Sequence, residues 1–129
     1  MRVLIDTSVW VDHFKRANAM LTTLLLKDGG CCHPLVLGEL ACGTPPAPRR
    51  RTLDDLGLLQ SVNHASMSEV FELIEDEQLY GLGCGWVDLS LLASVLITPD
   101  AQLWTHDKRL SGLAQRFGVR FEERRFLRR

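Results

Sequence analysis

Short apolar runs alternate along the chain with longer stretches in which apolar and polar positions repeat at helical spacing. The apolar runs predict strands at residues 2–5, 31–33, 58–62, 103–105 and 119–121. The longer stretches predict a first helix capped by Thr7 or Ser8, a helix opening at Pro34, and helices over residues 18–27, 52–56, 66–78, 87–97 and 108–117. Strands that alternate with helices favour an α/β fold whose mostly parallel sheet is covered on both faces.

Glycine and proline mark where several of these elements begin or end. Gly29 and Gly30 stop the second helix, and Pro34 suits a first helical turn because its fixed φ is already helical. The run Thr44-Pro45-Pro46-Ala47-Pro48 suits neither a helix interior nor a central strand, so it predicts a connection between two helices. No repeat or domain boundary interrupts the pattern, and we expect residues 1–129 to form a single domain.

The composition is that of an ordinary globular domain, with 46% hydrophobic and 24% charged residues among 129. No apolar run reaches the ~18 residues that a membrane span requires, and the first six residues lack the features of a signal peptide. We therefore expect a cytoplasmic protein. The cysteines have no C-x-x-C spacing and are expected to be small buried hydrophobic residues rather than a zinc site; they are Cys31, Cys32, Cys42 and Cys84.

The net charge of −1 is unevenly distributed along the chain. Residues 1–107 contain 7 Lys and Arg against 14 Asp and Glu, a net −7, whereas residues 108–129 contain 8 against 2, a net +6. This basic end is suited to contact phosphate groups, and a solvated terminal tail accounts for it equally well. The candidate RNA or partner contacts are Lys108, Arg109, Arg49, Arg50, Arg51, Arg124, Arg125, Arg128 and Arg129.

Four acidic residues occur in apolar surroundings, where an unpaired charge is costly. Asp6 and Asp107 follow predicted strands, Asp88 falls in the first turn of an apolar helix, and Glu39 falls within the helix that Pro34 opens. Because sites in parallel sheets form outside the carboxyl ends of the strands, we expect these four carboxylates to converge there. Converging carboxylates raise one another's pKa values, and a hard divalent cation such as Mg²⁺ relieves their repulsion.

A divalent cation held by carboxylates indicates a particular chemistry. Mg²⁺ usually keeps several waters, one of which can become a nucleophile, while the ion stabilises the charge that develops on a phosphate. The four acids thus point to hydrolysis of a phosphodiester bond. Each acid also has a structural alternative: Asp6 and Asp107 can cap the helices that follow them, Asp88 suits a first helical turn, and Glu39 can pair with an arginine.

The segments that contain the four acids resemble the motifs of PIN-domain ribonucleases. Their order is Asp6-Thr7-Ser8-Val9-Trp10 as the opening strand and turn, Glu39-Leu40-Ala41-Cys42-Gly43 as the helical E-L-x-x-G, Trp86-Val87-Asp88 as the third acidic motif, and Thr105-His106-Asp107-Lys108-Arg109-Leu110 as the closing T-x-D-x-x-L. The resemblance covers essentially the whole chain. The compact length resembles the toxin half of a VapBC toxin–antitoxin pair.

The resemblance implies a three-layer α/β/α sandwich, Mg²⁺ or Mn²⁺ at the acidic pocket, and cleavage of RNA. It makes Asp6 and Asp88 the main metal ligands and has Glu39 and Asp107 complete the pocket, directly or through water. It assigns to Thr105 the task of holding a carboxylate or a water in place. It also implies a homodimer and a small VapB-like antitoxin that blocks the active site.

Other conspicuous residues receive structural interpretations. We expect His106 to be packed rather than catalytic, and Asp12 to lie on the surface. Core packing is the expectation for the three tryptophans, Trp10, Trp86 and Trp104. At helical spacing the acids between residues 69 and 77 are expected to form a solvated face.

Two other functions are compatible with parts of the pattern. A phosphohydrolase can use an acid such as Asp6 at a strand end as its nucleophile, although haloacid-dehalogenase-like enzymes require D-x-D and Ser8 stands at the second position. A receiver domain requires a lysine after a late strand, whereas Lys108 directly follows Asp107. A non-catalytic PIN-like module is the second alternative, because an acidic pocket can also bind an arginine of a partner.

Overall fold

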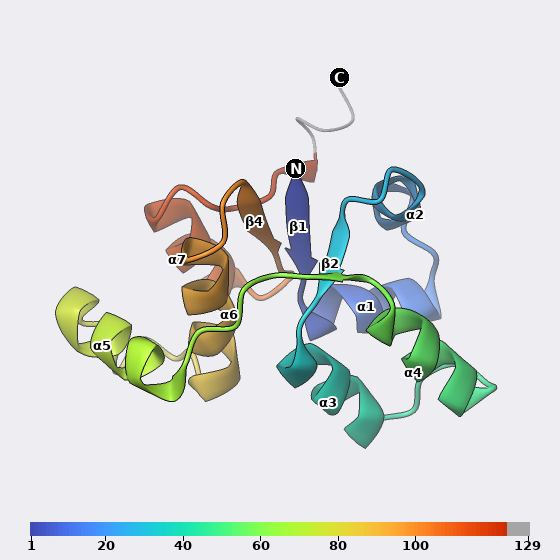
Figure 1. Ribbon diagram of the computed structural model, residues 1–129, viewed down its shortest axis with the longest axis horizontal. Helices are drawn as coiled ribbons and strands as arrows, with labels where there is room; N and C mark the ends of the chain where they lie inside the picture. Colours follow the sequence, from blue (N-terminus) through green and yellow to red (C-terminus); the bar gives the residue numbers. More distant parts are fainter. Residues whose placement is uncertain (124–129) are drawn as a thin grey trace.

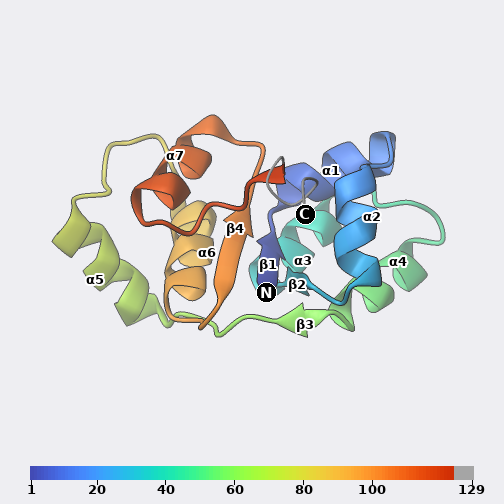
Figure 2. The same ribbon diagram turned by 90° about the horizontal axis from the view of Figure 1, so that it is seen from above.

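Parallel strands form the centre of the molecule. The computed structural model describes residues 1–123, in which four strands form one sheet in the order β3-β2-β1-β4, with every pair parallel. The strands are β1 (Arg2–Ile5), β2 (Gly30–Cys32), β3 (Gln60–Ser61) and β4 (Ala101–Trp104). The helices are α1 (Thr7–Lys15), α2 (Ala19–Leu26), α3 (Pro34–Cys42), α4 (Arg49–Gly57), α5 (Met67–Glu77), α6 (Trp86–Leu96) and α7 (Lys108–Arg116). Figures 1 and 2 show α1 to α4 on one side of the strands and α5 to α7 on the other, which confirms the predicted α/β fold.

The register of the sheet places the carboxyl ends of β1 and β4 side by side. Ile5 pairs with Trp104, and the backbone N–H of Asp6 donates to the Trp104 carbonyl at 2.9 Å, one residue beyond the strand. Parallel neighbours require a long crossover connection. Here the paired residues of β1 and β4 are 99 positions apart in the sequence. In Figure 1, α1 and α3 begin at this same end of the sheet. Residues that follow the strands are therefore gathered at one edge.

Several predicted boundaries are wrong. β3 occupies only Gln60–Ser61 of the predicted residues 58–62, and β4 is Ala101–Trp104 rather than residues 103–105. Asp6, rather than Thr7 or Ser8, caps α1, because its extended backbone lets its side chain accept the first N–H of the helix. The strand predicted over residues 119–121 is reduced to one bridge between Leu103 and Arg120, after the chain turns at Gly118 with a φ of 72°. The helix predicted over residues 52–56 begins three residues earlier, so the arginine triplet lies in its first turn.

α6 is buried along most of its length, as its nearly continuous apolar sequence predicts. All seven residues from Leu89 to Val95 are buried. The hydroxyl of Ser94 donates to the Ser90 carbonyl at 2.7 Å, and Thr98 donates in the same way to Ser94, so the backbone satisfies these polar groups. No helix within residues 1–123 is both long enough and apolar enough to cross a membrane.

Several apolar residues lie outside the core, against expectation. α5 buries Val70 but leaves Met67 and Phe71 exposed, and Trp86 at the start of α6 is 39% exposed. The rings of Phe71 and Trp86 instead contact each other, with centroids 4.9 Å apart. The two rings lie on the solvent-exposed side of the contact between α5 and α6, and each partly covers the other.

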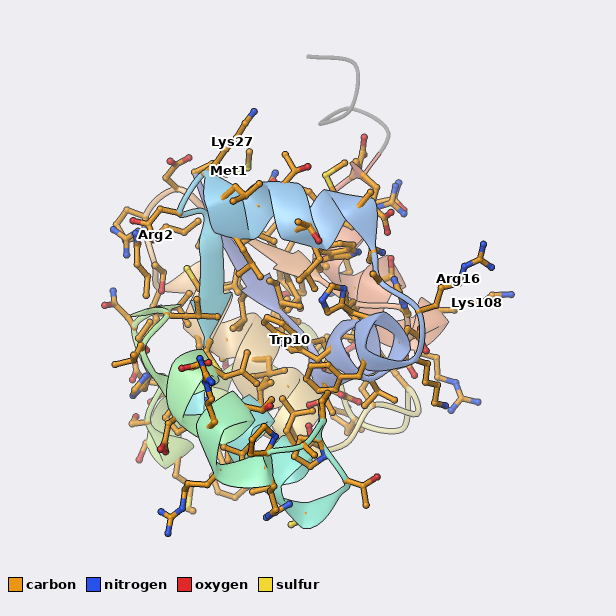
Figure 3. The ribbon with its side chains drawn as sticks, turned by 90° about the vertical axis from the view of Figure 1, so that its right-hand side faces the viewer. Met1, Arg2, Trp10, Arg16, Lys27 and Lys108 are labelled. Carbon is orange, nitrogen blue, oxygen red and sulfur yellow. The ribbon has the colours of Figure 1, made fainter. Side chains whose placement is uncertain are left out.

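The remaining tryptophans and two of the cysteines occupy the core. Trp10 and Trp104 are buried as expected, and Figure 3 shows Trp10 inside the molecule between α1 and the strands. The cysteines are all reduced; the two in β2 are buried, whereas Cys42 is exposed and Cys84 is half-buried. The expectation of buried cysteines is therefore wrong for these last two, which lie at a helix end and in a loop.

His33 is held neutral at the start of α3. Its Nδ1 accepts the N–H of Leu35 at 3.0 Å, and its Nε2 lies 3.2 Å from Oγ of Ser94. The Ser94 proton is directed to a carbonyl and its oxygen also accepts the N–H of Ala65, so Nε2 carries the hydrogen in the contact with His33. A second proton on Nδ1 would oppose the Leu35 N–H. Burial lowers the pKa of His33 to about 4.

Neutral His33 predicts that acid weakens the fold. Its pKa in an unfolded chain is near 6.5, so between pH 6.5 and about 4 the unfolded state binds a proton that the folded state does not. The free energy of unfolding should therefore fall as the pH drops through this window, by at most about 1.4 kcal/mol per pH unit. His33→Asn keeps a helix-capping acceptor and removes the titration. Urea unfolding at pH 7 and pH 5 should show a smaller difference for the variant; an equal difference would contradict this account.

Candidate active site

Four acidic residues from four parts of the chain gather at the carboxyl end of the sheet. Asp6 follows β1, Glu39 lies on α3, Asp88 lies in the first turn of α6, and Asp107 caps α7. The pKa of Asp88 is raised, first by burial and then by the charges of Asp6, Asp107 and Glu39, while the N–H of Gly85 lowers it. The structure thus brings Asp6, Glu39 and Asp107 within electrostatic reach of Asp88, as the sequence predicted for these four acids.

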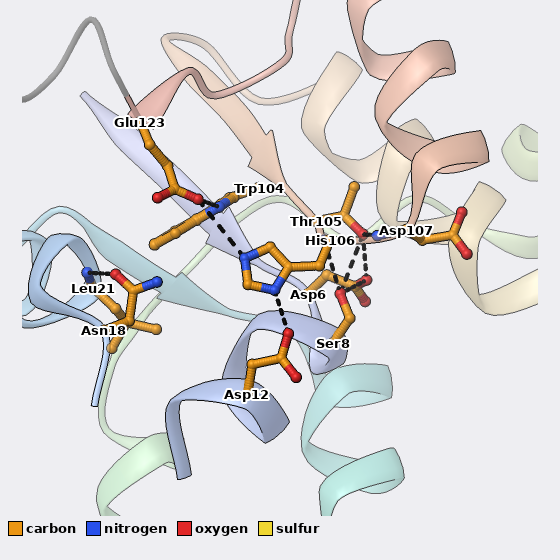
Figure 4. A network of polar contacts seen from close by, with 10 residues as sticks. All are labelled: Asp6, Ser8, Asp12, Asn18, Leu21, Trp104, Thr105, His106, Asp107 and Glu123. Atoms are coloured by element: carbon orange, nitrogen blue, oxygen red, sulfur yellow. Dashed lines mark hydrogen bonds and ion pairs between the residues drawn. The ribbon is translucent and has the colours of Figure 1, made fainter. Parts of the chain in front are cut away.

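Asp6 is the buried member of this group, with 5% of its surface exposed. Its Oδ1 accepts the N–H of Thr7 at 2.8 Å, and its Oδ2 accepts the hydroxyls of Ser8 at 2.9 Å and Thr105 at 2.7 Å (Figure 4). These donors compensate the burial of a charge and orient the carboxylate. The Thr105 hydroxyl also accepts the N–H of Asp107 at 3.0 Å, so one side chain connects two of the acids.

Glu39 is oriented from α1. The hydroxyl of Thr7 donates to Oε1 of Glu39 at 2.6 Å. Sequence reasoning considered Thr7 and Ser8 only as helix caps and missed that their hydroxyls position two carboxylates. The available signal was the Asp6-Thr7-Ser8 run itself, since a buried carboxylate needs donors and hydroxyls next to it in the chain are well placed to supply them.

The expectation that all four acids lie in apolar surroundings is wrong for two of them. Glu39 and Asp107 are exposed, and Asp88 is half-buried. α3 buries Leu40 on its inner side and leaves Glu39 in solvent, because successive helical residues point in different directions. Asp107 lies ahead of α7, where its Oδ1 accepts the N–H of Leu110 at 2.9 Å as a helix cap. The cost of burial therefore falls mainly on Asp6.

His106 lies between two carboxylates rather than in the core. Its Nδ1 is 2.5 Å from Oδ2 of Asp12, and its Nε2 is 3.7 Å from Oε1 of Glu123 (Figure 4). The expectation of a packed histidine is wrong because β4 ends at Trp104, so the alternation of strand faces does not extend to His106. Asp12 is exposed as expected, and it pairs with this histidine.

The arginine triplet at the start of α4 serves more than one purpose. Arg49 donates to the carbonyls of Gly43 at 3.1 Å and Ala41 at 2.5 Å, and so satisfies the end of α3. Arg50 and Arg51 are exposed and form no hydrogen bond or ion pair within the part of the chain that the structure describes. The terminal candidates Arg124, Arg125, Arg128 and Arg129 lie outside the described residues.

Two cations begin α7 beside the acids. Lys108 projects into solvent, as Figure 3 shows, and Arg109 is also exposed. Arg109 lies across the loop before α6, where a Cβ on Gly83 would come within 2.8 Å of its flexible side chain; the φ of Gly83 is 88°, so the backbone favours glycine at this position. Burial and two of the four acids raise the pKa of the Cys84 thiol while Arg109 lowers it, which places this cation near the acids.

The acids form an open group of oxygen donors. Glu39, Asp88 and Asp107 each use one carboxylate oxygen in a hydrogen bond, and the other oxygen has no hydrogen-bond partner within residues 1–123. Carboxylate oxygens of this kind are ligands for hard cations. No three His, Cys, Asp or Glu side chains in the described residues are close enough together to enclose an ion. Any cation at this place would therefore keep several water ligands, because fewer than three of these side chains could hold it directly.

The chain is similar in sequence to a named bacterial ribonuclease. It is 42% identical over 121 residues to Ribonuclease VapC32 of Mycobacterium tuberculosis, and the match covers 94% of this chain and 97% of the relative. The same values hold for the relative from strain CDC 1551 / Oshkosh and from strain ATCC 25618 / H37Rv. No protein-family model matches the chain.

The raised pKa of Asp88 predicts that its charge destabilises the protein when no cation is bound. A carboxyl whose folded pKa lies above its ordinary value of 3.8 contributes stability at low pH that is lost as the pH rises. Asp88→Asn keeps an acceptor for the Gly85 N–H and removes the charge. In EDTA at pH 7, calorimetry should give this variant a Tm a few degrees above that of the unchanged protein, and the gap should narrow towards pH 4. Glu72→Gln on α5 is the control. A Tm of Asp88→Asn below that of the unchanged protein would show that the charge of Asp88 does not destabilise the fold.

Proposed function

The chain belongs to the VapC family of ribonucleases, and on this basis we propose that it is a metal-dependent endoribonuclease and the toxin of a toxin–antitoxin pair. The observation that carries the proposal is the match to a protein named as a ribonuclease over nearly the whole length of both chains. The gathering of Asp6, Glu39, Asp88 and Asp107 at one edge of the sheet supports hydrolysis of RNA phosphodiester bonds at that place.

The proposed cofactor is Mg²⁺ or Mn²⁺. The donors fit such an ion, because Glu39, Asp88 and Asp107 each have a carboxylate oxygen without a hydrogen-bond partner in the described residues. Burial and the charges of the other three acids also disfavour the negative charge of Asp88, which a cation would stabilise. Mg²⁺ in proteins is commonly bound by one or two carboxylates while it keeps several waters, which agrees with the open arrangement. Asp6 and Asp88 are the proposed main ligands, and Glu39 and Asp107 complete the site directly or through water. When bound, the cation supplies an activated water and offsets charge on the phosphate.

The neighbouring residues are proposed to hold the acids in position for this reaction. Thr105 and Ser8 fix Asp6, and Thr7 fixes Glu39, each through a hydroxyl whose proton points at a carboxylate oxygen. Groups fixed before the substrate binds need not reorganise during the reaction, which is how an enzyme site gains much of its electrostatic advantage.

Cations beside the site are proposed to contact the RNA backbone. Arg109 lies near the acids across the Gly83 loop, and Lys108 adjoins it, so both can neutralise phosphates on either side of the bond that is cut. Arg50 and Arg51 are further candidates on α4. Arg49 is engaged with the end of α3, so its contribution would be indirect.

The proposed partners follow from the family. We propose that a small VapB-like antitoxin binds the chain and blocks the acidic site, that the chain forms a homodimer, and that it acts in the cytoplasm. The name of the relative supports the toxin class.

The alternative in which Asp6 attacks phosphate directly has less support. Asp6 is buried and accepts three hydrogen bonds, of about four that a carboxylate can accept, so a lone pair on Oδ1 remains. A carboxylate held in this way suits a fixed ligand of a small cation better than a nucleophile that must move to form a bond to phosphorus. A non-catalytic module is separated from a nuclease by the first experiment below.

Purified protein with Mg²⁺ or Mn²⁺ is expected to cleave total cellular RNA, and EDTA is expected to stop it. Asp6→Asn and Asp88→Asn should each lower the rate by at least ~100-fold, because they alter proposed ligands; Thr105→Val should cost roughly 10–100-fold, as is typical of a residue that supports a ligand. Gel analysis with end mapping provides the rates. The control Glu72→Gln should cut like the unchanged protein. Full activity in EDTA or in Asp6→Asn would disprove the metal site.

Divalent ions should also stabilise the fold without any substrate. An ion that binds only the folded protein at 100 times its Kd adds about 2.7 kcal/mol to the free energy of unfolding. Differential scanning calorimetry should therefore show a higher Tm in Mg²⁺ or Mn²⁺ than in EDTA. The rise should be smaller for Asp88→Asn. A Tm that is the same in Mg²⁺, Mn²⁺ and EDTA would contradict the binding of a divalent cation at the four acids.

A further inference from the structure

A cavity of about 540 Å³ lies between α1, α3 and the connection that follows α3. Its volume is within the roughly 300–1,000 Å³ that is typical of sites for small organic groups. Its apolar walls are formed by Val11, Phe14, Leu40, Pro45 and Pro46. The cavity is thus large enough for a small organic group and has apolar walls against which such a group can pack.

The cavity is continuous with the acidic site. Thr7 and Glu39, which are joined by a hydrogen bond of 2.6 Å, both line it. Glu39 also acts electrostatically on Asp88. A molecule whose phosphate lies among the four acids therefore has its next unit beside the cavity.

Lys15 supplies a cation at the cavity wall. It is exposed, it lines the cavity, and within residues 1–123 it forms no hydrogen bond or ion pair. An apolar slot with an ammonium group beside it matches the two parts of a nucleotide, whose base has π-faces and whose phosphate is anionic.

The loop wall of the cavity is fastened to both neighbouring helices. Arg49 donates to the carbonyls of Ala41 and Gly43 at the end of α3, and the hydroxyl of Thr52 donates to the carbonyl of Pro46 at 2.8 Å. The prolines therefore form a built surface. Arg49, which was a candidate for direct RNA contact, acts here as a positioning residue.

We propose that this cavity binds one unpaired nucleobase of the RNA, that of a nucleotide adjoining the bond that is cut, and so determines which RNA the enzyme accepts. The inference rests on the proposed nuclease function, because it is the continuity with the acids that identifies the occupant. A base held in a duplex cannot enter such a cavity, so the preferred substrate is a single-stranded segment or a loop. A side chain of a protein partner is the competing occupant.

The test combines a protein variant whose cavity is filled by a larger side chain with RNA substrates that lack one base. Val11 is 37% exposed, so Val11→Trp can place its ring in the cavity without opening the core. The substrates are a short single-stranded RNA that is cut at one position and two copies that are abasic on one or the other side of the cut. The unchanged protein should lose roughly tenfold in kcat/KM on one abasic RNA, as expected for the loss of one stacked base. Val11→Trp should cut the intact RNA about tenfold more slowly and should not distinguish it from that abasic copy.

Controls separate this result from a general loss of structure. Leu58→Trp adds the same ring at a site that is 84% exposed and outside the cavity, and it should behave like the unchanged protein. Phe14→Leu is a second cavity variant, expected to discriminate less between the RNAs while it keeps its Tm within a few degrees. Discrimination that is equal in Val11→Trp, Phe14→Leu and the unchanged protein would overturn the proposal and assign the cavity to a protein partner.

A binding measurement keeps the inference distinct from the proposed function. Absence of cleavage by the unchanged protein with Mg²⁺ or Mn²⁺ would overturn the nuclease proposal. The affinities of Asp6→Asn for the same RNAs, measured by fluorescence anisotropy, then decide the role of the cavity. Tighter binding of the intact RNA that disappears in the Asp6→Asn, Val11→Trp double variant supports a base site; equal affinities overturn it.

Discussion

The hydrogen bond from Thr105 to the carboxylate of Asp6 is the interaction on which the site depends. It joins residues 99 positions apart, at the place where β1 and β4 end side by side. With Ser8 and the first N–H of α1, it supplies hydrogen-bond donors to a carboxylate that is 5% exposed, where a carboxylate without donors would be strongly disfavoured. The same hydroxyl accepts the N–H of Asp107, so the positions of the two acids are not independent.

The remaining acids impose the opposite constraint, because each one added to the group repels the others. The fold limits this repulsion by leaving Glu39 and Asp107 in solvent and by placing Arg109 within electrostatic reach of Cys84, as Asp88 and Asp107 also are. The pKa of Asp88 is raised first by its burial and then by the charges of the other three acids. The charge of Asp88 thus lowers stability at the place where we propose that a cation binds, which is a common relation between stability and function at active sites.

The order of elements, the parallel sheet and the buried α6 could all be predicted, because hydrophobic periodicity and strand ends depend on local sequence. The placement of acids after strands also followed from local pattern. The directions of single side chains did not. Glu39 has apolar neighbours in the sequence, yet its side chain is exposed. The hydrogen bond from Thr7 to Glu39 joins residues 32 positions apart and depends on how α1 packs against α3. Trp86 is hydrophobic yet faces Phe71 at the surface, because the outer edge of the α5–α6 pair is not covered.

The sheet order also bears on when during synthesis the protein becomes competent. β1, β2 and β3 emerge from the ribosome first, but the other edge of β1 pairs with β4, whose residues follow their partners in β1 by 99 positions. Contacts between distant segments form late because loop closure must precede them. A nascent chain that ends before Thr105 has Asp6 without its partner hydroxyl and lacks Asp107 altogether. The ribosome that makes this member of a ribonuclease family is itself built of RNA, and this topology defers assembly of the acidic site until residues 105–107 have been made.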